Sequence, residues 1–292
     1  MDLIWYAVPL FLLTMLIEWR ITAPKQTKGG YALKDTAASI AMGLGNRLIG
    51  ILPKLGVFAA WMWLWENYRL FDIPQDAWWV WVLLIPLEDF CYYWFHRSSH
   101  EVRFLWAAHV NHHSSTHYNL STAVRQSWTT PFTGPLFWTA LPLLGFHPLM
   151  VSIAMALNLL YQYWIHTELI GSMGWFEYVF NSPSHHRVHH GRNPEYLDRN
   201  HGGIFILWDR LFGTFEPERA EVDYGLTKNL DTYNLLTIAF HEWAAIFADV
   251  VRAKTWRGRL GYVFMPPGWN EDGTGKTSKV LRAEAEAHRK TG

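Results

Sequence analysis

The run Asn181–Gly191 reads NSPSHHRVHHG and holds four histidines within eleven residues. His186, His189 and His190 stand at positions i, i+3 and i+4, so a helix here places three imidazoles on one face. Neutral imidazole binds zinc, copper, iron and nickel, and this spacing directs several rings at one point. The run alone also fits a polar helix end with solvated histidines, so the neighbouring sequence has to decide.

Two further histidine runs lie upstream. HRSSH (96–100) is an i, i+4 pair, and HVNHH (109–113) repeats the spacing of the first run. Arg97 stands where the zinc proteases carry the glutamate of His-Glu-x-x-His, which argues against that class. Eight imidazoles at helical spacing are too many for one four-coordinate zinc ion and predict a site for two metal ions. They are His96, His100, His109, His112, His113, His186, His189 and His190.

The composition indicates long apolar segments. Hydrophobic residues make up 50% of the 292 residues and charged residues 17%, below the roughly 25% of an ordinary globular domain. The 18 tryptophans and 13 tyrosines suit membrane interfaces. Lys+Arg and Asp+Glu both number 25, so the overall charge does not favour nucleic acid. Cys91 is the only cysteine, which excludes a disulfide within the chain and a site of several thiolates.

Several apolar stretches predict helices embedded in a membrane. Basic residues follow the first stretch at Arg20, Lys25, Lys28 and Lys34, which assigns that flank to the cytoplasm. Counting crossings from there places the histidine runs on the cytoplasmic side. The predicted stretches are Leu3–Trp19, Ile51–Trp65, Ala77–Phe95 and a hairpin made of Pro131–Leu144 and Pro148–Ile165.

The predicted fold class is therefore an all-α integral membrane protein, with about four to five membrane-embedded helices. A cytosolic, histidine-rich helical cap is expected to hold the dinuclear metal site. The predicted division is 1–76 for N-terminal membrane helices, 77–215 for the catalytic domain, and 216–292 for a C-terminal amphipathic helix and polar tail. Leu230–Val251 is the expected amphipathic helix, and from Asn270 the tail is expected to be a short helix or disordered.

Carboxylates near the histidines are candidate catalytic residues. Glu88 and Asp89 lie inside an apolar stretch, where a carboxylate is costly and points to function. Asp89 lies seven residues before His96, on the same helix face. Glu168 follows His166 in the stretch QYWIHTE. Since neutral imidazoles leave the charge of bound cations uncompensated, a carboxylate is expected close to the metals.

The three histidine runs resemble the histidine boxes of the fatty acid hydroxylase superfamily, which includes sterol desaturases. Asp89, QYWIHT (162–167) and WDRLFGTF (208–215) fit the same pattern, so the resemblance extends from about Ala77 to Phe215. Within the family, SPSHHRVHHGRN (182–193) and WIHTE (164–168) are most similar to the members that cleave alkylglycerol ether lipids.

The resemblance implies a membrane di-iron enzyme that uses O2 to hydroxylate a lipid C–H bond, and to cleave an ether lipid in that way. It carries the eight box histidines over as ligands and adds His166. His201 stands where the family often has tyrosine, so His201 and His185 are expected only to surround the ligands. Asp89 and Glu168 are expected to orient the ligand imidazoles by accepting their distal N–H groups.

The implied partners are a lipid substrate, the membrane and a source of electrons. The sequence contains no Gly-rich dinucleotide fingerprint and no C-x-x-C-H haem motif. The resemblance implies tetrahydrobiopterin or an external electron-transfer protein as the reductant. The expected location is a cell inner membrane or a membrane of the endoplasmic reticulum type, with the active site facing the cytoplasm.

Other readings of the sequence remain open. Within the family, the chain also fits a sterol or fatty-acyl hydroxylase or desaturase, and zinc-assisted hydrolysis is chemically possible. Outside it, a membrane metal transporter or a bis-histidine haem protein would use the same residue types. A transporter should carry its acidic and histidine residues in mid-span. Here they gather at helix ends and in polar loops, which favours the enzyme.

Overall fold

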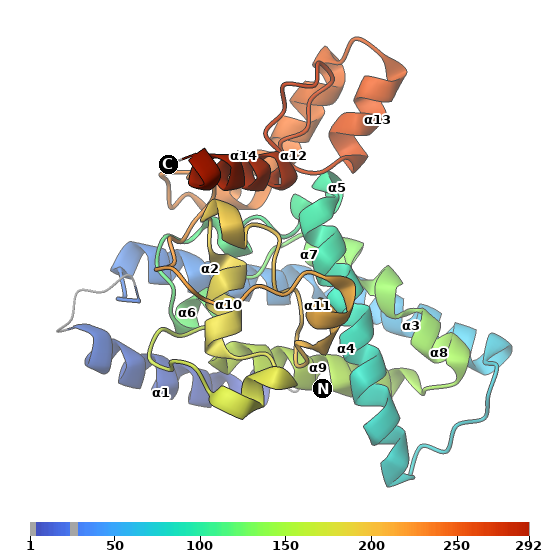
Figure 1. Ribbon diagram of the computed structural model, residues 1–292. Coiled ribbons are helices and arrows are strands. Elements are labelled where there is room, and N and C mark those ends of the chain that lie inside the picture. The colour runs from blue at the N-terminus through green and yellow to red at the C-terminus, as the bar shows by residue number, and fades with distance from the viewer. Residues whose placement is uncertain (1–3, 24–28, 292) are drawn as a thin grey trace.

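The computed structural model describes residues 4–23 and 29–291, with side chains as far as His288. Every regular element in that part of the chain is a helix, and its β contacts are two isolated bridges, Phe180–Phe205 and Gly191–Tyr224. Figure 1 shows the helices arranged around the middle of the chain, with the C-terminal helices above it. The predicted all-α fold class is confirmed for the described residues.

The N-terminal part consists of three helices, α1 (Ile4–Thr22), α2 (Leu33–Ile49) and α3 (Ile51–Tyr68). α2 and α3 meet at Gly50 with a bend of 47°. Pro53 lies in the first turn of α3 and has no N–H to continue the hydrogen-bond ladder, which accounts for the bend. The predicted stretch 51–65 lies within α3, and the structure joins it to α2 through this bend.

Two long helices form the centre of the molecule, α4 (Trp78–Glu101) and α9 (Pro148–Trp164). α4 contains the predicted span 77–95 and continues through the first histidine run, so that run is helical. The buried faces of the two helices share an apolar core with short neighbouring helices. The core includes Val80, Leu84, Tyr92, Phe95, Trp138, Leu141, Val151 and Ala154.

The predicted first arm of the hairpin is not one helix. It consists of α7 (Thr130–Thr133), a 3-10 helix (Pro135–Trp138) and α8 (Ala140–Leu144). Pro131, Pro135 and Pro142 each remove a backbone donor, and such a stretch cannot form one continuous helix. Gly145 then turns the chain with φ of 117°, and the His147 side chain caps α9. The returning arm agrees with the predicted 148–165 segment.

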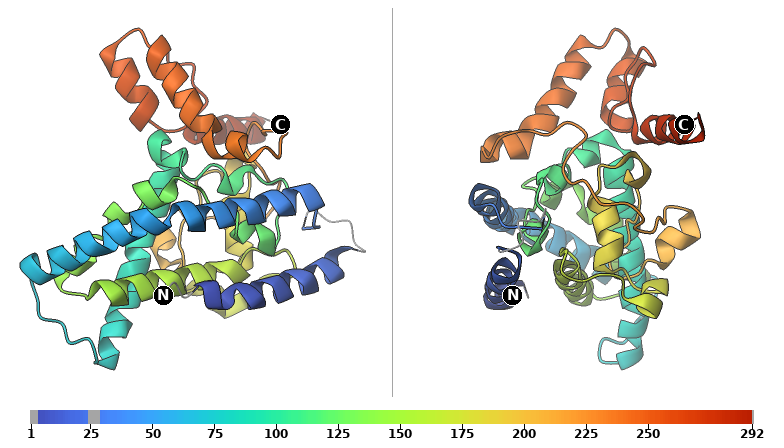
Figure 2. Two further views of the ribbon diagram at one scale, coloured as in Figure 1. Left: turned by 180° about the vertical axis from the view of Figure 1, so that it is seen from behind. Right: turned by 60° about the vertical axis from the view of Figure 1, so that its left-hand side comes forward.

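The remaining elements surround the histidine-rich segments. The C-terminal pair α12–α13 projects from the body in all three views, and the tail after it forms a helix (Figures 1 and 2). These elements are α5 (Arg103–Trp106), α6 (Leu120–Ala123), α10 (Pro183–His190), α11 (Leu207–Phe212), α12 (Leu235–Arg252), α13 (Trp256–Phe264), α14 (Ser278–Thr291) and 3-10 helices at His112–Ser114, Gly174–Tyr178 and Pro194–Tyr196.

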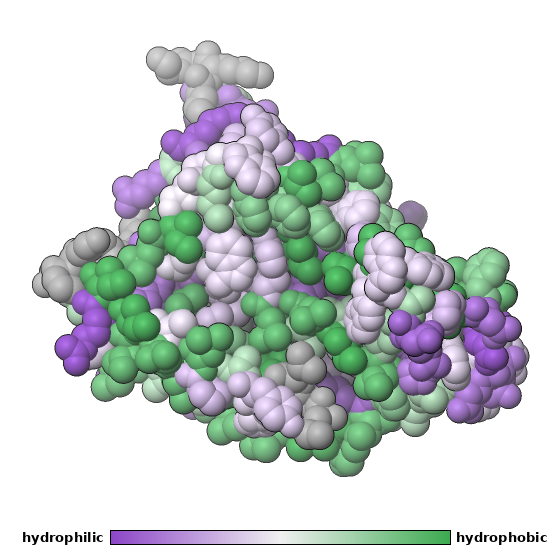
Figure 3. All heavy atoms as spheres, turned by 90° about the horizontal axis from the view of Figure 1, so that it is seen from below, coloured by the Kyte–Doolittle hydropathy of each residue, from purple (hydrophilic) through white to green (hydrophobic). Residues whose placement is uncertain are grey.

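Fewer helices than predicted pass as membrane spans by length and composition. Among the described residues α1 qualifies, and the bent pair α2–α3 qualifies if it counts as one span. The underside of the molecule, where α1 and α9 lie in Figure 1, is largely hydrophobic (Figure 3). On α1, Tyr6, Leu10 and Leu12 are more than half exposed. Leu3, Lys25 and Lys28, which belong to the predicted first span and its basic flank, lie outside the described residues.

Buried polar contacts attach the N-terminal helices to the histidine-rich middle. Glu18 of α1 accepts hydrogen bonds from the Leu120 amide (2.8 Å), Tyr31 (2.5 Å) and the Thr167 hydroxyl. Asp35 of α2 pairs with Arg125 across 3.4 Å, with both side chains at least 94% buried. The first segment of the chain therefore braces the part of the chain that lies between the second and third histidine runs.

The Asp35–Arg125 pair leads to a stability prediction. Replacing Asp35 with Asn leaves the Arg125 guanidinium buried without its counter-charge, so we expect the free energy of unfolding to fall by about 3 kcal/mol. Denaturant unfolding in detergent measures the change. The exposed pair Arg69–Asp72 provides the control, because Asp72 is 86% exposed and D72N should change the free energy by less than about 1 kcal/mol. Equal effects of the two variants would contradict the bracing role.

Candidate metal centre

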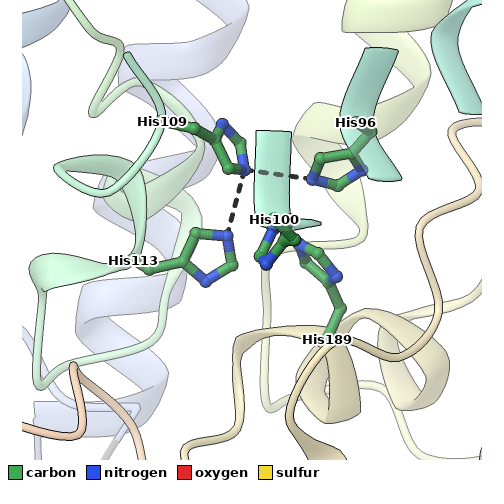
Figure 4. Close-up of side chains that lie close together, drawn as sticks. All are labelled: His96, His100, His109, His113 and His189. Carbon is green, nitrogen blue, oxygen red and sulfur yellow. Dashed lines mark hydrogen bonds between the residues drawn. The ribbon is translucent and has the colours of Figure 1, made fainter. Parts of the chain in front are cut away.

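The histidine runs converge on one buried region as two groups. We refer to residues 96–100, 109–113 and 186–190 as boxes one, two and three. The first group offers five ligand nitrogens that all lie within 4.8 Å of one another, and Figure 4 shows their rings turned toward a common centre. This five-histidine group consists of His96, His100, His109, His113 and His189.

The second group lies beside the first and offers four ligand nitrogens, again within 4.8 Å of one another. All four of its side chains are buried. The rings of His113 and His190 stack at a centroid distance of 4.3 Å, which joins the two groups. This four-histidine group consists of His112, His166, His186 and His190.

Boxes two and three each contribute to both groups. In box three, which is α10, His186 and His190 face the four-histidine group, while His189 faces the other. In box two, His109 and His113 belong to the five-histidine group and His112 to its neighbour. The sequence predicted that each run would direct its rings at one point. The structure instead places these two runs between the groups, since adjacent residues of a helical turn point in different directions.

Backbone carbonyl groups fix the orientation of the rings. The Nδ1–H groups of His96 and His189 donate to the carbonyls of His201 (2.8 Å) and Arg199 (2.9 Å). His166 donates in the same way to the carbonyl of Gln162, at 2.7 Å. A proton held on Nδ1 leaves the lone pair of Nε2 directed at the group. His112 follows the same pattern, with the Arg125 carbonyl at 3.3 Å.

The inward nitrogens approach one another closely and have few other partners. Nε2 of His109 lies 3.1 Å from Nε2 of His96 and 3.1 Å from Nε2 of His113 (Figure 4). Nε2 of His166 lies 3.0 Å from that of His186. Buried Nε2 atoms without a partner occur on His100, His189 and His190. An unpaired buried polar atom costs about 1–3 kcal/mol, and a cation among these lone pairs would satisfy them, so both groups fit a metal ion.

Burial also favours the form of imidazole that binds metals. Removal from water, together with the neighbouring histidines, holds the pKa of most of these rings well below the ordinary value. For His112, burial lowers the pKa to about 4. The rings with a lowered pKa are therefore neutral near pH 7, and no proton competes for their inward nitrogens.

Asp89 is fully buried but binds backbone groups rather than a histidine. Its carboxylate accepts hydrogen bonds from the amides of Ile204 (2.6 Å) and Phe205 (3.0 Å) and from the Trp208 indole (2.9 Å). A fourth donor is the Asn158 amide, at 2.9 Å. The expected direct bond to an imidazole is therefore absent from the hydrogen bonds of this carboxylate. Asp89 instead holds the segment after His201, whose carbonyl orients His96.

Glu168 likewise reaches the histidines through other side chains. Its carboxylate accepts the hydroxyl of Tyr224 at 2.9 Å. Tyr224 stacks on Tyr118, with ring planes 5° apart, and Tyr118 packs against the rings of His166 and His190. Glu168 thus supports the aromatic wall of the four-histidine group, where the sequence predicted a bond to a ligand ring.

Asp198, a carboxylate that the sequence analysis did not single out, lies near a box histidine. Asp198 Oδ1 lies 3.6 Å from Nδ1 of His100, and Arg282 of α14 lies 3.8 Å from the other oxygen. Arg282 also donates to the carbonyl of Leu197 at 2.5 Å. Asp198 has a φ of 52°, a left-handed conformation that aspartate adopts more easily than most residues. Asp198 stands in the polar run after box three, where a carboxylate is ordinary, so its local sequence does not mark it as functional.

His201 and His185 were expected to surround the ligands, and they do so differently. The ring of His201 is fully buried 5.1 Å from that of His100, and neither of its nitrogens has a hydrogen-bond partner of normal geometry. His185 packs against Phe215 on the far side of α10. Gln162 contributes its carbonyl to His166, and its side-chain amide bonds to Asn158 and Tyr92.

The position of Asp198 leads to a prediction about metal binding. In D198N the carboxylate next to Nδ1 of His100 becomes a neutral amide, and loss of such outer partners weakens metal affinity by about tenfold or more. We expect this loss at the five-histidine group and little change at the other. Chelator competition with a spectroscopically visible ion such as Co²⁺ measures both affinities. D223N is the matched control, because Asp223 pairs with Arg192 at 2.7 Å. Unchanged affinities in D198N would remove Asp198 from the centre.

Comparisons with known proteins agree with the boxes. Residues 81–214 match the family model described as fatty acid hydroxylase. The chain is 40% identical to alkylglycerol monooxygenase of Homo sapiens over 283 residues, which cover 97% of this chain and 63% of that protein. The protein of the same name from Danio rerio is 39% identical over 264 residues and is covered to 58%. The chain thus spans about three fifths of the length of these relatives.

The chain matches a more distant relative over a larger share of that relative's own length. The cholesterol 25-hydroxylase-like protein of Danio rerio is 30% identical over 193 residues, which are 61% of this chain and 72% of that protein. No solved structure gives a significant match. The resemblance drawn from the histidine boxes is confirmed, together with the similarity to alkylglycerol monooxygenases, and the chain belongs to the fatty acid hydroxylase family.

Proposed function

We propose that this protein is a membrane di-iron monooxygenase that uses O2 to hydroxylate a lipid C–H bond, with an alkylglycerol ether lipid as its substrate. The observation that carries the proposal is the convergence of nine histidines, eight of them buried, into two adjoining groups that could each hold a metal ion. The similarity to alkylglycerol monooxygenases over most of the chain supports the substrate class. Lipid oxidation is also the activity named for the more distant relatives.

In this proposal each histidine group holds one iron ion, which when bound supplies the chemistry for reducing O2. The protein's own contribution is to fix the ligands and exclude water. The backbone carbonyls of Arg125, Gln162, Arg199 and His201 keep a proton on the distal nitrogens. The indole of Trp106 packs against the rings of His100 and His113 and covers one side of the five-histidine group. Asp89 supports the centre by holding the backbone of the segment after His201. Glu168 supports it through Tyr224, which stacks on Tyr118.

The overall reaction needs a source of electrons. Hydroxylation consumes one O2, two electrons and two protons, and yields one alcohol and one water. If the carbon beside the ether oxygen is hydroxylated, the product is a hemiacetal, whose C–O bond breaks to give an aldehyde and a glycerol. We propose tetrahydrobiopterin or an electron-transfer protein as the external reductant.

The surface supports a location in a membrane. α1 is apolar and only 11% of it is buried inside the molecule, so a lipid environment is the natural cover for its side chains. We propose an inner membrane or a membrane of the endoplasmic reticulum type, with the metal centre on the cytoplasmic side. We retain the division 1–76, 77–215 and 216–292, in which the outer segments brace the middle one.

Iron content tests the metal assignment. H189A removes a ligand of the five-histidine group and H190A one of the four-histidine group, so we expect each to lower bound iron and to abolish activity. H190A leaves three imidazoles in its group and should lose its iron more completely than H189A, which leaves four. Metal analysis of the purified variants, beside the O2 consumption of each, measures both effects.

A histidine outside both groups is the control for these variants. The ring nitrogen of His241 contacts the carbonyl of Thr237 on its own helix, and H241A should retain iron and activity. Removal of iron from the unmodified protein by a chelator should abolish activity, and added Fe²⁺ should restore it. Full activity of H189A without iron would refute the proposal.

A lipid panel tests the substrate class. With ¹⁸O2 and a reductant, we expect labelled aldehyde from an alkylglycerol and little product from a sterol or a fatty acyl chain. Mass spectrometry distinguishes aldehyde release from simple hydroxylation and from desaturation, which introduces no label. Labelled alcohol from a sterol or fatty acyl lipid alone would select the alternative within the family.

A further inference from the structure

The α12–α13 pair presents an apolar face that the rest of the described chain does not cover. We refer to residues 235–264 from here on as the hairpin; it is distinct from the membrane hairpin predicted for residues 131–165. Its exposed apolar side chains follow helical spacing, so they lie along one side of each helix. On α12 they are Leu236 (63% exposed), Phe240 (41%), Phe247 (72%) and Val251 (64%), and on α13 they are Trp256 (75%), Leu260 (55%) and Phe264 (57%).

Cations surround the end of this apolar face. Arg252, Lys254, Arg257 and Arg259 lie within eight residues at the turn between the two helices, and all four are exposed. The Arg259 guanidinium lies over the ring of Trp256, at 5.1 Å. Glu271 binds the turn through the Lys254 amide and the Thr255 hydroxyl, so it offsets one of the charges. The cations remain in excess next to exposed aromatic side chains.

The opposite side of the hairpin is firmly attached to the protein. The acidic residues of the hairpin are Glu242 and Asp249, and both pair with Arg103 of α5, at 2.6 and 2.7 Å. The Trp243 indole donates to Thr129 at 3.3 Å. Because both acidic side chains of the hairpin pair with the body, its exposed charged side chains are all cationic.

An apolar hollow adjoins this face. It has a volume of about 310 Å³ and is lined by Phe104, Thr129, Phe132, Thr133, Phe240 and Trp243. Phe240 belongs both to the exposed face of α12 and to the lining of the hollow. The apolar face and the hollow therefore form one continuous surface.

We propose that the hairpin is a second lipid-binding surface, which seats on a bilayer that contains anionic lipids. Apolar and aromatic side chains beside a cluster of Lys and Arg are the composition of helices that lie in the headgroup region. The four cations complement anionic headgroups, whereas a protein partner would have to match both the cations and the aromatic side chains. In the proposed orientation the hairpin lies at the rim of the hollow. A lipid chain that leaves the bilayer there would contact an apolar surface.

Site-directed spin labelling of the whole protein in lipid nanodiscs tests this surface without relying on activity. With Cys91 replaced by Ala, a label is attached at F247C or L260C, and a control label at T274C, which is exposed in the polar segment after the hairpin. In discs that contain phosphatidylglycerol, oxygen should relax the labels at 247 and 260 more than an aqueous nickel chelate does. The order should be reversed at 274.

The charge contribution is tested with the four cations replaced. In R252Q/K254Q/R257Q/R259Q, the lipid exposure of the label at 260 should no longer differ between discs with phosphatidylglycerol and discs of phosphatidylcholine alone, while in the parent it should be greater with phosphatidylglycerol. Greater chelate than oxygen relaxation at 247 and 260 in the parent would overturn the proposal. Spin–spin broadening between labels, which indicates a second copy on this face, would overturn it as well.

Discussion

The arrangement depends on a physical conflict: nine imidazoles, eight of them buried, have lone pairs directed at one another. Burial lowers the pKa of rings such as His96 and His189, so that they carry no positive charge that would repel their neighbours. Nitrogens at 3.0–3.3 Å from one another and unpaired Nε2 atoms leave the interior electron-rich and incompletely satisfied. The surrounding protein has to hold this arrangement in place, and a bound cation would complete it.

Much of the surrounding structure can be understood as support for those rings. α1 and α2 reach the middle of the chain through Glu18 and Asp35, whose partners lie next to boxes two and three. α12 is attached through Arg103, immediately after box one. α14 contacts the loop after box three through Arg282. Four helices outside the matched family region, α1, α2, α12 and α14, therefore contact segments that flank the histidine boxes.

The sequence contained enough to predict that the eight box histidines gather, because box spacing is a local property of helices, while His166 came from the resemblance to the family. The sequence could not predict how they divide, since the separation of His189 from His186 and His190 depends on where α10 lies between the other elements. The predicted arm 131–144 forms short helices, in keeping with its prolines. The roles of Asp89 and Asp198 depend on long-range contacts, such as that between Asp89 and the amides of residues 204 and 205, which no local pattern encodes.

The acceptors for the distal nitrogens are main-chain carbonyls, and this has an evolutionary consequence. A side chain at position 125, 162, 199 or 201 can change while its carbonyl group stays where it is. The bond to the imidazole therefore does not fix the identity of these residues, although Arg125 is held separately by its ion pair with Asp35. The path of the backbone is the feature that must be preserved. Asp198 and Asn200, whose backbone adopts the left-handed conformation, help to set that path. Because main-chain carbonyls orient the rings, residues around this centre can be substituted while its geometry is retained.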